Sequence, residues 1–232
     1  MNVRKPLIAG IFSAVLSSLA WVTEQEAVTT LSPLLVASLA PLLAAIILFP
    51  VVRWRIVRAK GSTRSYLSVI RKNLHAFVLI VFARNIVGFL LFTTALLYTS
   101  SAKVMFLTKI EPYVVLGIHW IAFGERIKRN EFLLLLIHIF GAILLSTGLS
   151  LEFHIEQWGD LLVCFGILAS ASVYRPGKKL SEELGAMEST MITSGVSGLI
   201  LLPVALYFKH TNLLQGHATY YGLTFLMLTV FL

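Results

Sequence analysis

The sequence predicts an all-α membrane protein, a bundle of helices that crosses the lipid bilayer several times. Three observations predict this fold class: 57% of the 232 residues are hydrophobic, only 13% are charged, and the charges cluster between long apolar runs. Globular domains carry about 25% charged residues, and the mean hydropathy here is +0.86. A soluble fold is excluded because the apolar runs leave no polar face for water.

Eight apolar runs are the candidate membrane spans, because an α-helix needs about 20 residues to cross the hydrocarbon layer. They cover residues 6–22, 31–52, 74–101, 104–124, 132–151, 158–174, 189–208 and 218–232. Run one follows Arg4 and Lys5 as a secretory signal would, but its small residues recur every four positions, which favours a retained helix. Run eight has 15 residues before the sequence ends, so we expect the natural protein to continue for roughly 70 residues, with two further helices.

The basic residues lie in alternate connections between the runs. Of 19 Lys and Arg, 15 fall before run one, between runs two and three, after run four or after run six. This asymmetry predicts a multi-pass protein of the inner cell membrane, with a cytoplasmic N-terminus. It also explains the basic excess without nucleic acid, which we do not expect as a partner. We expect residues 53–72 and 175–188 to be cytoplasmic loops, the first with an amphipathic segment on the membrane surface.

A weak internal repeat divides the chain. Residues 46–51 (IILFPV) match residues 199–204 (LILLPV) at an offset of 153 positions. The copies are five runs apart, an odd number, so the second must enter the membrane in the opposite direction. Inverted repeats of this kind are common in secondary transporters. We therefore expect one repeat in residues 1–151, with five spans, and part of a second in residues 152–232, with three.

Residues 95–144 carry a more specific pattern. The run ALLYTSSA at 95–102 is followed by Glu111-Pro112, by GER at 124–126 and by GAIL at 141–144. Together they resemble helices three to five of the EamA domain of the drug/metabolite transporter superfamily, and residues 159–174 resemble the start of a second such domain. The resemblance implies two inverted five-helix repeats, about eight of the ten helices being present here. It also implies a secondary transporter that works without ATP and is not an enzyme.

Three charged residues fall inside the predicted spans, where a charge at a helix centre costs at least about 2.5 kcal/mol. Arg84 lies ten residues into run three, while Lys109 and Glu111 lie in run four. All three fall near the middle of the bilayer, where transporters hold substrate and coupling ions. We expect Arg84 and Glu111 to form an ion pair between the two helices. The alternative of one internal network of all three charges, without substrate contact, stays open.

The predicted substrate site centres on Lys109. Tyr113 and Trp120 share its face of a regular helix, and Asn85 is a further candidate. Pro112 interrupts this helix and Pro41 falls inside run two, as in the broken helices at transporter sites. A cation in the cavity favours a small polar metabolite with an anionic group, such as an amino acid or organic acid. Glu111 would couple transport to a proton when it loses its partner.

Other chemistry has no support in the sequence. No two of the six histidines stand three to five residues apart and Cys164 is the single cysteine, so we expect no metal site. We find no P-loop and no nucleophile elbow, and we expect no catalytic residue and no cofactor. The expected partners are the lipid bilayer, a small-molecule substrate with a proton, and optionally a second copy of the chain. The alternative function is a non-transporting membrane scaffold or partner subunit.

Overall fold

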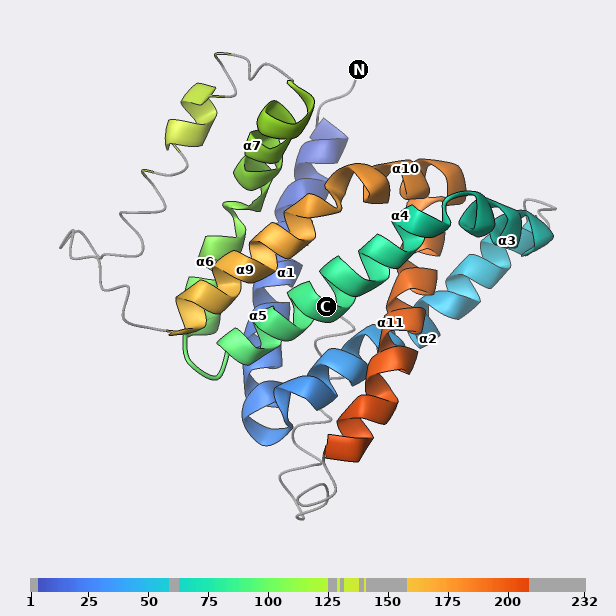
Figure 1. Ribbon diagram of the computed structural model, residues 1–232, viewed down its shortest axis with the longest axis horizontal. Coiled ribbons are helices and arrows are strands. Elements are labelled where there is room, and N and C mark those ends of the chain that lie inside the picture. Colours follow the sequence, from blue (N-terminus) through green and yellow to red (C-terminus); the bar gives the residue numbers. More distant parts are fainter. Residues whose placement is uncertain are drawn as a thin grey trace.

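The computed structural model describes residues 4–58, 63–124, 132–137 and 158–208, together with Arg129 and Phe140. All regular structure in these residues is helical, and they contain no strand (Figure 1). Four helical segments there are long and apolar enough to cross a bilayer: Pro33–Arg58, Leu74–Ala95, Ser101–Ala122 and Ala186–Phe208. The predicted all-α membrane bundle is confirmed to this extent. Run eight, most of run five and the connection at 152–157 lie outside the described residues.

Helix α1 (Arg4–Thr30) runs past the predicted end of run one. Glu24, which follows the predicted end of run one at residue 22, lies inside the helix and is only 5% exposed. Nothing between residues 22 and 30 breaks the helix, and the Thr30 hydroxyl donates to the Glu26 carbonyl at 3.1 Å. The chain turns only at Leu31 and Ser32, where the Ser32 hydroxyl accepts the Leu35 N–H and Pro33 begins α2 (Pro33–Arg58).

Run three forms one continuous helix with a change of register in its middle. It consists of α4 (Leu74–Leu79), the π-helix η1 (Ile80–Gly88) and α5 (Phe89–Ala95). The Phe89 N–H donates to the Arg84 carbonyl, five residues back. Gly88 lets α9 (Trp158–Ser172) approach, because a Cβ at this position would lie 3.1 Å from the Ser170 hydroxyl. π-Helical turns occur frequently at functional sites, so the segment Ile80–Gly88 is a candidate for part of such a site.

Run four is split by a two-residue turn. Helix α6 (Ser101–Thr108) is capped by the Ser100 side chain, which accepts the Lys103 N–H. The N–H groups of Lys109 and Ile110 donate to carbonyls three residues back rather than four, and α7 (Glu111–Phe123) begins directly after them. Pro112 lies in the first turn of α7, where its missing N–H costs nothing. Pro41, in contrast, lies inside α2, which is helical on both sides of it.

Two amphipathic helices lie where we expected cytoplasmic loops. Helix α3 (Thr63–Lys72) precedes α4, and α10 (Tyr174–Leu184) joins α9 to α11 (Ala186–Phe208). Leu180 and Leu184 of α10 are buried with Ile80 and Val173, and the apolar residues of α3 pack against this cluster. The apolar face of α3 is therefore turned to other helices, although Leu67 remains 70% exposed.

Helices α2 and α11 make the most extensive helix contact in the described part of the chain, and Figure 1 shows them side by side. They are antiparallel: a Cβ on Gly198 would lie 2.8 Å from Leu42 Cβ, and one on Gly195 would lie 3.2 Å from Ala45 Cβ. The two contacts are related by the repeat offset, because Leu42 plus 153 is position 195 and Gly198 minus 153 is position 45. The two helices that carry the matching segments are thus related by a local twofold axis at their contact.

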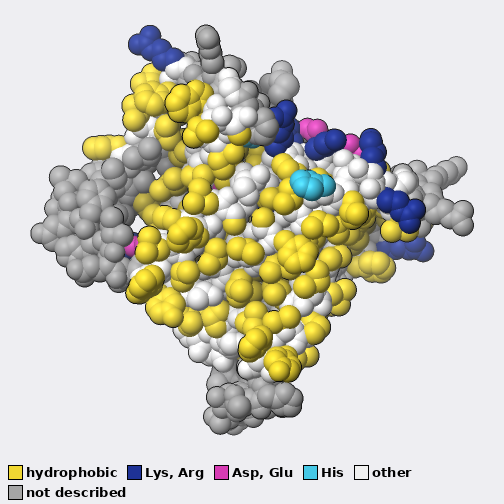
Figure 2. Space-filling model, in the orientation of Figure 1, with side chains coloured by type: hydrophobic (Ala, Val, Ile, Leu, Met, Phe, Trp, Pro, Cys, Tyr) yellow, Lys and Arg dark blue, Asp and Glu magenta, His cyan; other side chains and the backbone are white. Residues whose placement is uncertain are grey.

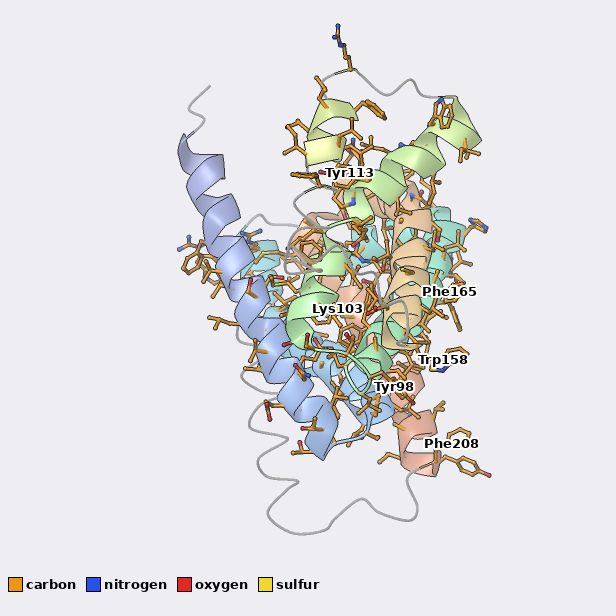
Figure 3. All side chains as sticks on the ribbon, turned by 90° about the vertical axis from the view of Figure 1, so that its left-hand side faces the viewer. Tyr98, Lys103, Tyr113, Trp158, Phe165 and Phe208 are labelled. Carbon is orange, nitrogen blue, oxygen red and sulfur yellow. The ribbon has the colours of Figure 1, made fainter. Side chains whose placement is uncertain are left out.

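The two ends of the bundle differ in charge. The start of α1, the end of α2, the end of α7, and α3 and α10 all lie at one end, which we call the basic end. Figure 2 shows Lys and Arg side chains along this end and hydrophobic side chains over most of the remaining described face. Figure 3 shows Tyr98, Trp158 and Phe208 towards the opposite end, and all three are exposed. Exposed aromatic rings at a span end are typical of the membrane interface.

Candidate functional site

A polar cavity of about 450 Å³ lies between η1, α10 and α11, on the side of the basic end. Two of its residues, Arg84 and Asn85, come from the π-helix of span three. A third residue of this helix, Ile80, also lines the cavity. The rest of the wall comes from α10 and α11: Tyr174, Gly177, Lys178, Ser181, Ser189, Thr190, Thr193 and Ser194. Hydroxyl and cationic side chains thus make up most of the lining of this cavity.

Arg84 and Asn85 give the cavity its strongest hydrogen-bond donors. Arg84 is exposed to the cavity space, and the Asn85 side-chain Nδ2 is buried with no hydrogen-bond partner. A buried amide donor without a partner is costly, so native structures rarely leave one unused without a reason. The guanidinium group of Arg84 presents several donors in a plane that matches a carboxylate or phosphate. The pair is suited to bind an anionic group.

The hydroxyl wall comes from a polar stripe on α11. Ser189, Thr190, Thr193 and Ser194 stand at relative positions 0, 1, 4 and 5, which fall on one side of an α-helix. The Thr193 hydroxyl donates to the Ser189 carbonyl at 2.9 Å, so this donor is satisfied within its own helix while the hydroxyl oxygen can still accept. Our sequence interpretation missed this stripe, although its spacing is the signal that would have found it.

Glu111 lies in the first turn of α7, and Arg84 lies in η1. No salt bridge within 4.0 Å joins these two described residues. The direct ion pair that we expected between these residues is therefore not formed in this arrangement. Arg84 therefore keeps its donors for the cavity.

The other predicted substrate residues lie elsewhere. Lys109 forms the C-cap of α6 and is exposed, while the Tyr113 hydroxyl donates to the Leu134 carbonyl at 3.5 Å. Trp120 is 57% exposed on α7. None of these three residues lines the polar cavity. The structure thus brings Asn85 together with Arg84 and separates both from the group centred on Lys109.

The opposite end of the bundle is joined by an ion pair. Lys103 Nζ of α6 lies 2.6 Å from Asp160 Oδ2 of α9, and both side chains are largely buried. The Gln25 side chain of α1 accepts the Ser101 N–H at 2.9 Å, which ties a third helix to the same place. Figure 3 shows Lys103 on α6, nearer the end marked by Tyr98 than Tyr113 is. These contacts join α1, α6 and α9 at the end away from the polar cavity, where Gln25, Tyr98 and Lys103 also line a separate pocket of about 540 Å³.

Within the described residues, no group of three or more His, Cys, Asp or Glu side chains is placed to hold a metal ion. The residues that line the polar cavity are mostly hydroxyls and cationic donors, which can bind and orient a polar solute.

Comparison with known proteins supports the resemblance seen in residues 95–144. A search of curated proteins found none that matches the chain. A family comparison, however, matches the EamA-like transporter family over residues 4–147, which is more than half of the 232 residues. Members of that family are in general not enzymes, and membership implies transport across a membrane. The chain belongs to the EamA-like transporter family and is a multi-pass membrane protein.

Proposed function

We propose that the protein is a secondary transporter of a small polar metabolite that carries a carboxylate or phosphate group, and that the polar cavity binds this anion. The observation that carries the proposal is the pair formed by Arg84 and Asn85 on a π-helical turn inside a membrane span. The buried Asn85 donor lacks a partner, and a bound anionic solute supplies one. Amino acids and organic acids fit this description.

The proposed mechanism is alternating access between two inverted repeats, residues 1–151 and 152–232. The α2–α11 contact supports it, because Leu42 with Gly198 and Ala45 with Gly195 exchange under the 153-residue offset. Two helices related in this way can rock against each other about one axis. The polar cavity takes residues from both proposed repeats, since η1 belongs to the first and α11 to the second.

In the proposed cycle, this arrangement is the state in which the substrate reaches the polar cavity from the basic end. The polar cavity lies towards the basic end, while Lys103 and Asp160 tie α6 to α9 at the opposite end. By the positive-inside rule, the basic end faces the cytoplasm. The Lys103–Asp160 pair would then break when the outer side opens.

Glu111 supplies the counter-charge in this proposal. In this proposal the carboxylate of Glu111, which does not line the polar cavity, partly neutralises the Arg84 guanidinium inside the membrane before the substrate binds. A substrate anion competes for the same guanidinium and leaves Glu111 uncompensated, which favours uptake of a proton by Glu111. Substrate and proton would thereby move together.

Uptake into proteoliposomes tests the proposal. The purified protein is reconstituted and offered radiolabelled amino acids and organic acids under an imposed proton gradient, with protein-free vesicles as the blank. Arg84→Gln should lower the uptake of any accepted substrate about 10- to 100-fold, the range for a lost hydrogen bond to a charged group. Arg71→Gln, an exposed arginine of α3, is the matched control and should transport normally.

The uptake assay has three outcomes, which distinguish an anion site at Arg84, an anion site at Lys109 and a scaffold function. Uptake that needs Arg84 but not Arg71 supports the cavity. An equal loss in Lys109→Gln with normal uptake in Arg84→Gln would return the substrate anion to Lys109, as the sequence alone suggested. No uptake of any acid by a correctly folded protein, with binding of another membrane protein instead, would favour the scaffold.

A further inference from the structure

A second and larger cavity, of about 1080 Å³, lies at the basic end between α4, α7, α9 and α10. It touches the polar cavity only through Tyr174 and Lys178, which line both. Nothing in the proposed transport cycle uses its other walls. Its chemistry therefore needs a separate explanation.

One part of the wall is strongly basic. The positively charged and imidazole side chains that line it are Lys72, His75, His119, Arg175, Lys178 and Lys179. The single carboxylate among the lining residues is Glu182. Lys72 is also held 3.4 Å from Glu183, outside the lining, so its charge is partly balanced. His119 and Arg175 make further interactions of their own, and Lys178 and Lys179 add positive charge that would attract an anion.

The other part of the wall is apolar. Ala76 and Leu79 of α4, Ile118 and Ala122 of α7, and Ala171 of α9 line it. These positions lie within about two turns of the helix ends at Leu74, Phe123 and Ser172. The basic and apolar walls thus meet where the membrane spans end, at the depth of lipid headgroups. A soluble anion needs no apolar wall at that depth, whereas a lipid does.

We propose that this cavity binds a phosphate group attached to an apolar body, with the phosphate on the basic wall and the apolar part against Leu79 and Ile118. Two sources have this chemistry: an anionic phospholipid of the surrounding leaflet and a soluble phosphate ester. The depth of the cavity favours the lipid. Basic pockets between transmembrane helices on the cytoplasmic side are the general setting in which anionic headgroups bind.

Native mass spectrometry of the detergent-purified full chain tests the proposal without any transport assay. The probe is dioleoyl phosphatidylglycerol, with dioleoyl phosphatidylcholine as the zwitterionic reference. Arg175→Gln with Lys179→Gln should weaken phosphatidylglycerol binding at least about tenfold, because it removes two cationic hydrogen-bond donors that line the cavity. Arg55→Gln with Arg71→Gln removes the same charge at the same end but outside this cavity, and should change binding less than threefold.

A steric variant protects the test against misfolding of the charge variant. Ala122→Phe fills part of the apolar wall and leaves every charge in place, so it should weaken phosphatidylglycerol binding while leaving the thermal midpoint near that of the wild type. Glycerol phosphate at the same concentration should not displace the lipid. Displacement at equal concentration would assign the site to soluble phosphate esters instead of lipid, within the same proposed chemistry.

Two results would overturn the proposal. One is an equal loss of binding in the cavity pair and in the control pair of arginines, which would mean only diffuse attraction to a basic surface. The other is phosphatidylcholine binding as tightly as phosphatidylglycerol, with Ala122→Phe unchanged.

Discussion

Replacing Gly198 by alanine should destabilise the protein by forcing α2 and α11 apart. The added Cβ would lie 2.8 Å from Leu42 Cβ and 2.8 Å from the Ser38 carbonyl oxygen. Both atoms are fixed to the α2 backbone, so no side-chain rotation can relieve the overlap, and the helices must separate along their closest contact. Overpacking of this kind costs about 1–3 kcal/mol.

Replacing glycine by alanine also stabilises a helix, and this gain must be separated from the steric cost. In a helix interior, alanine is better than glycine by about 1 kcal/mol. The variant Gly117→Ala in α7 measures this gain in helix propensity alone, because a Cβ at Gly117 meets nothing within 4 Å. The unfolding free energy of Gly198→Ala should therefore fall about 1–3 kcal/mol below that of Gly117→Ala. Gly195→Ala, with one contact at 3.2 Å to Ala45 Cβ, should lie between the two.

Reversible unfolding in mixed micelles, titrated with sodium dodecyl sulfate and followed by circular dichroism, gives the three free energies. Small residues let membrane helices pack closely because dispersion contacts replace the hydrophobic effect there. If Gly198→Ala proves as stable as Gly117→Ala, then α2 and α11 do not approach as closely as described, and the local twofold relation loses its support.

Two further perturbations test the ends of the bundle. A double-mutant cycle with Lys103→Met and Asp160→Asn should give a coupling free energy of unfolding of about 1–2 kcal/mol, because the ion pair is short and largely buried. If the two destabilisations simply add, the two side chains do not interact. At the basic end, the hydrogen bond from Asn73 and then the charge of Lys72 hold the pKa of Glu183 below its ordinary value. A lowered pKa stabilises the fold above the ordinary value of 4.5 and loses this effect as the pH falls through the folded pKa. The wild type should therefore have a higher thermal midpoint than Glu183→Gln near pH 7, and this difference should shrink below pH 4.5. The control Glu182→Gln should not show it. A difference that persists at pH 3, or that the control reproduces, would contradict this cause.

The location of the site was only partly predictable from the residues. Arg84 and Asn85 stand out in the sequence because charged and amide side chains are expensive inside a membrane span. Which cation faces a cavity, however, depends on its angle around the helix. If run four were one regular α-helix, Lys109 would be the cation that faces the cavity. The turn after Thr108 instead leaves Lys109 exposed. The π-helical register of η1 places Arg84 and Asn85 on the cavity instead.

The sequence by itself determined the membrane class, the difference in charge between the ends, and the family, because these follow from composition and local order. Tertiary structure alone decided the burial of Glu24, the packing of α3 and α10, and the α11 wall of the cavity. The physical reason is that hydropathy fixes which segments enter the bilayer but says little about how each is rotated. Rotation is set by packing, such as the approach of α9 to Gly88, and a change of register within one turn is enough to exchange the residue that faces the cavity.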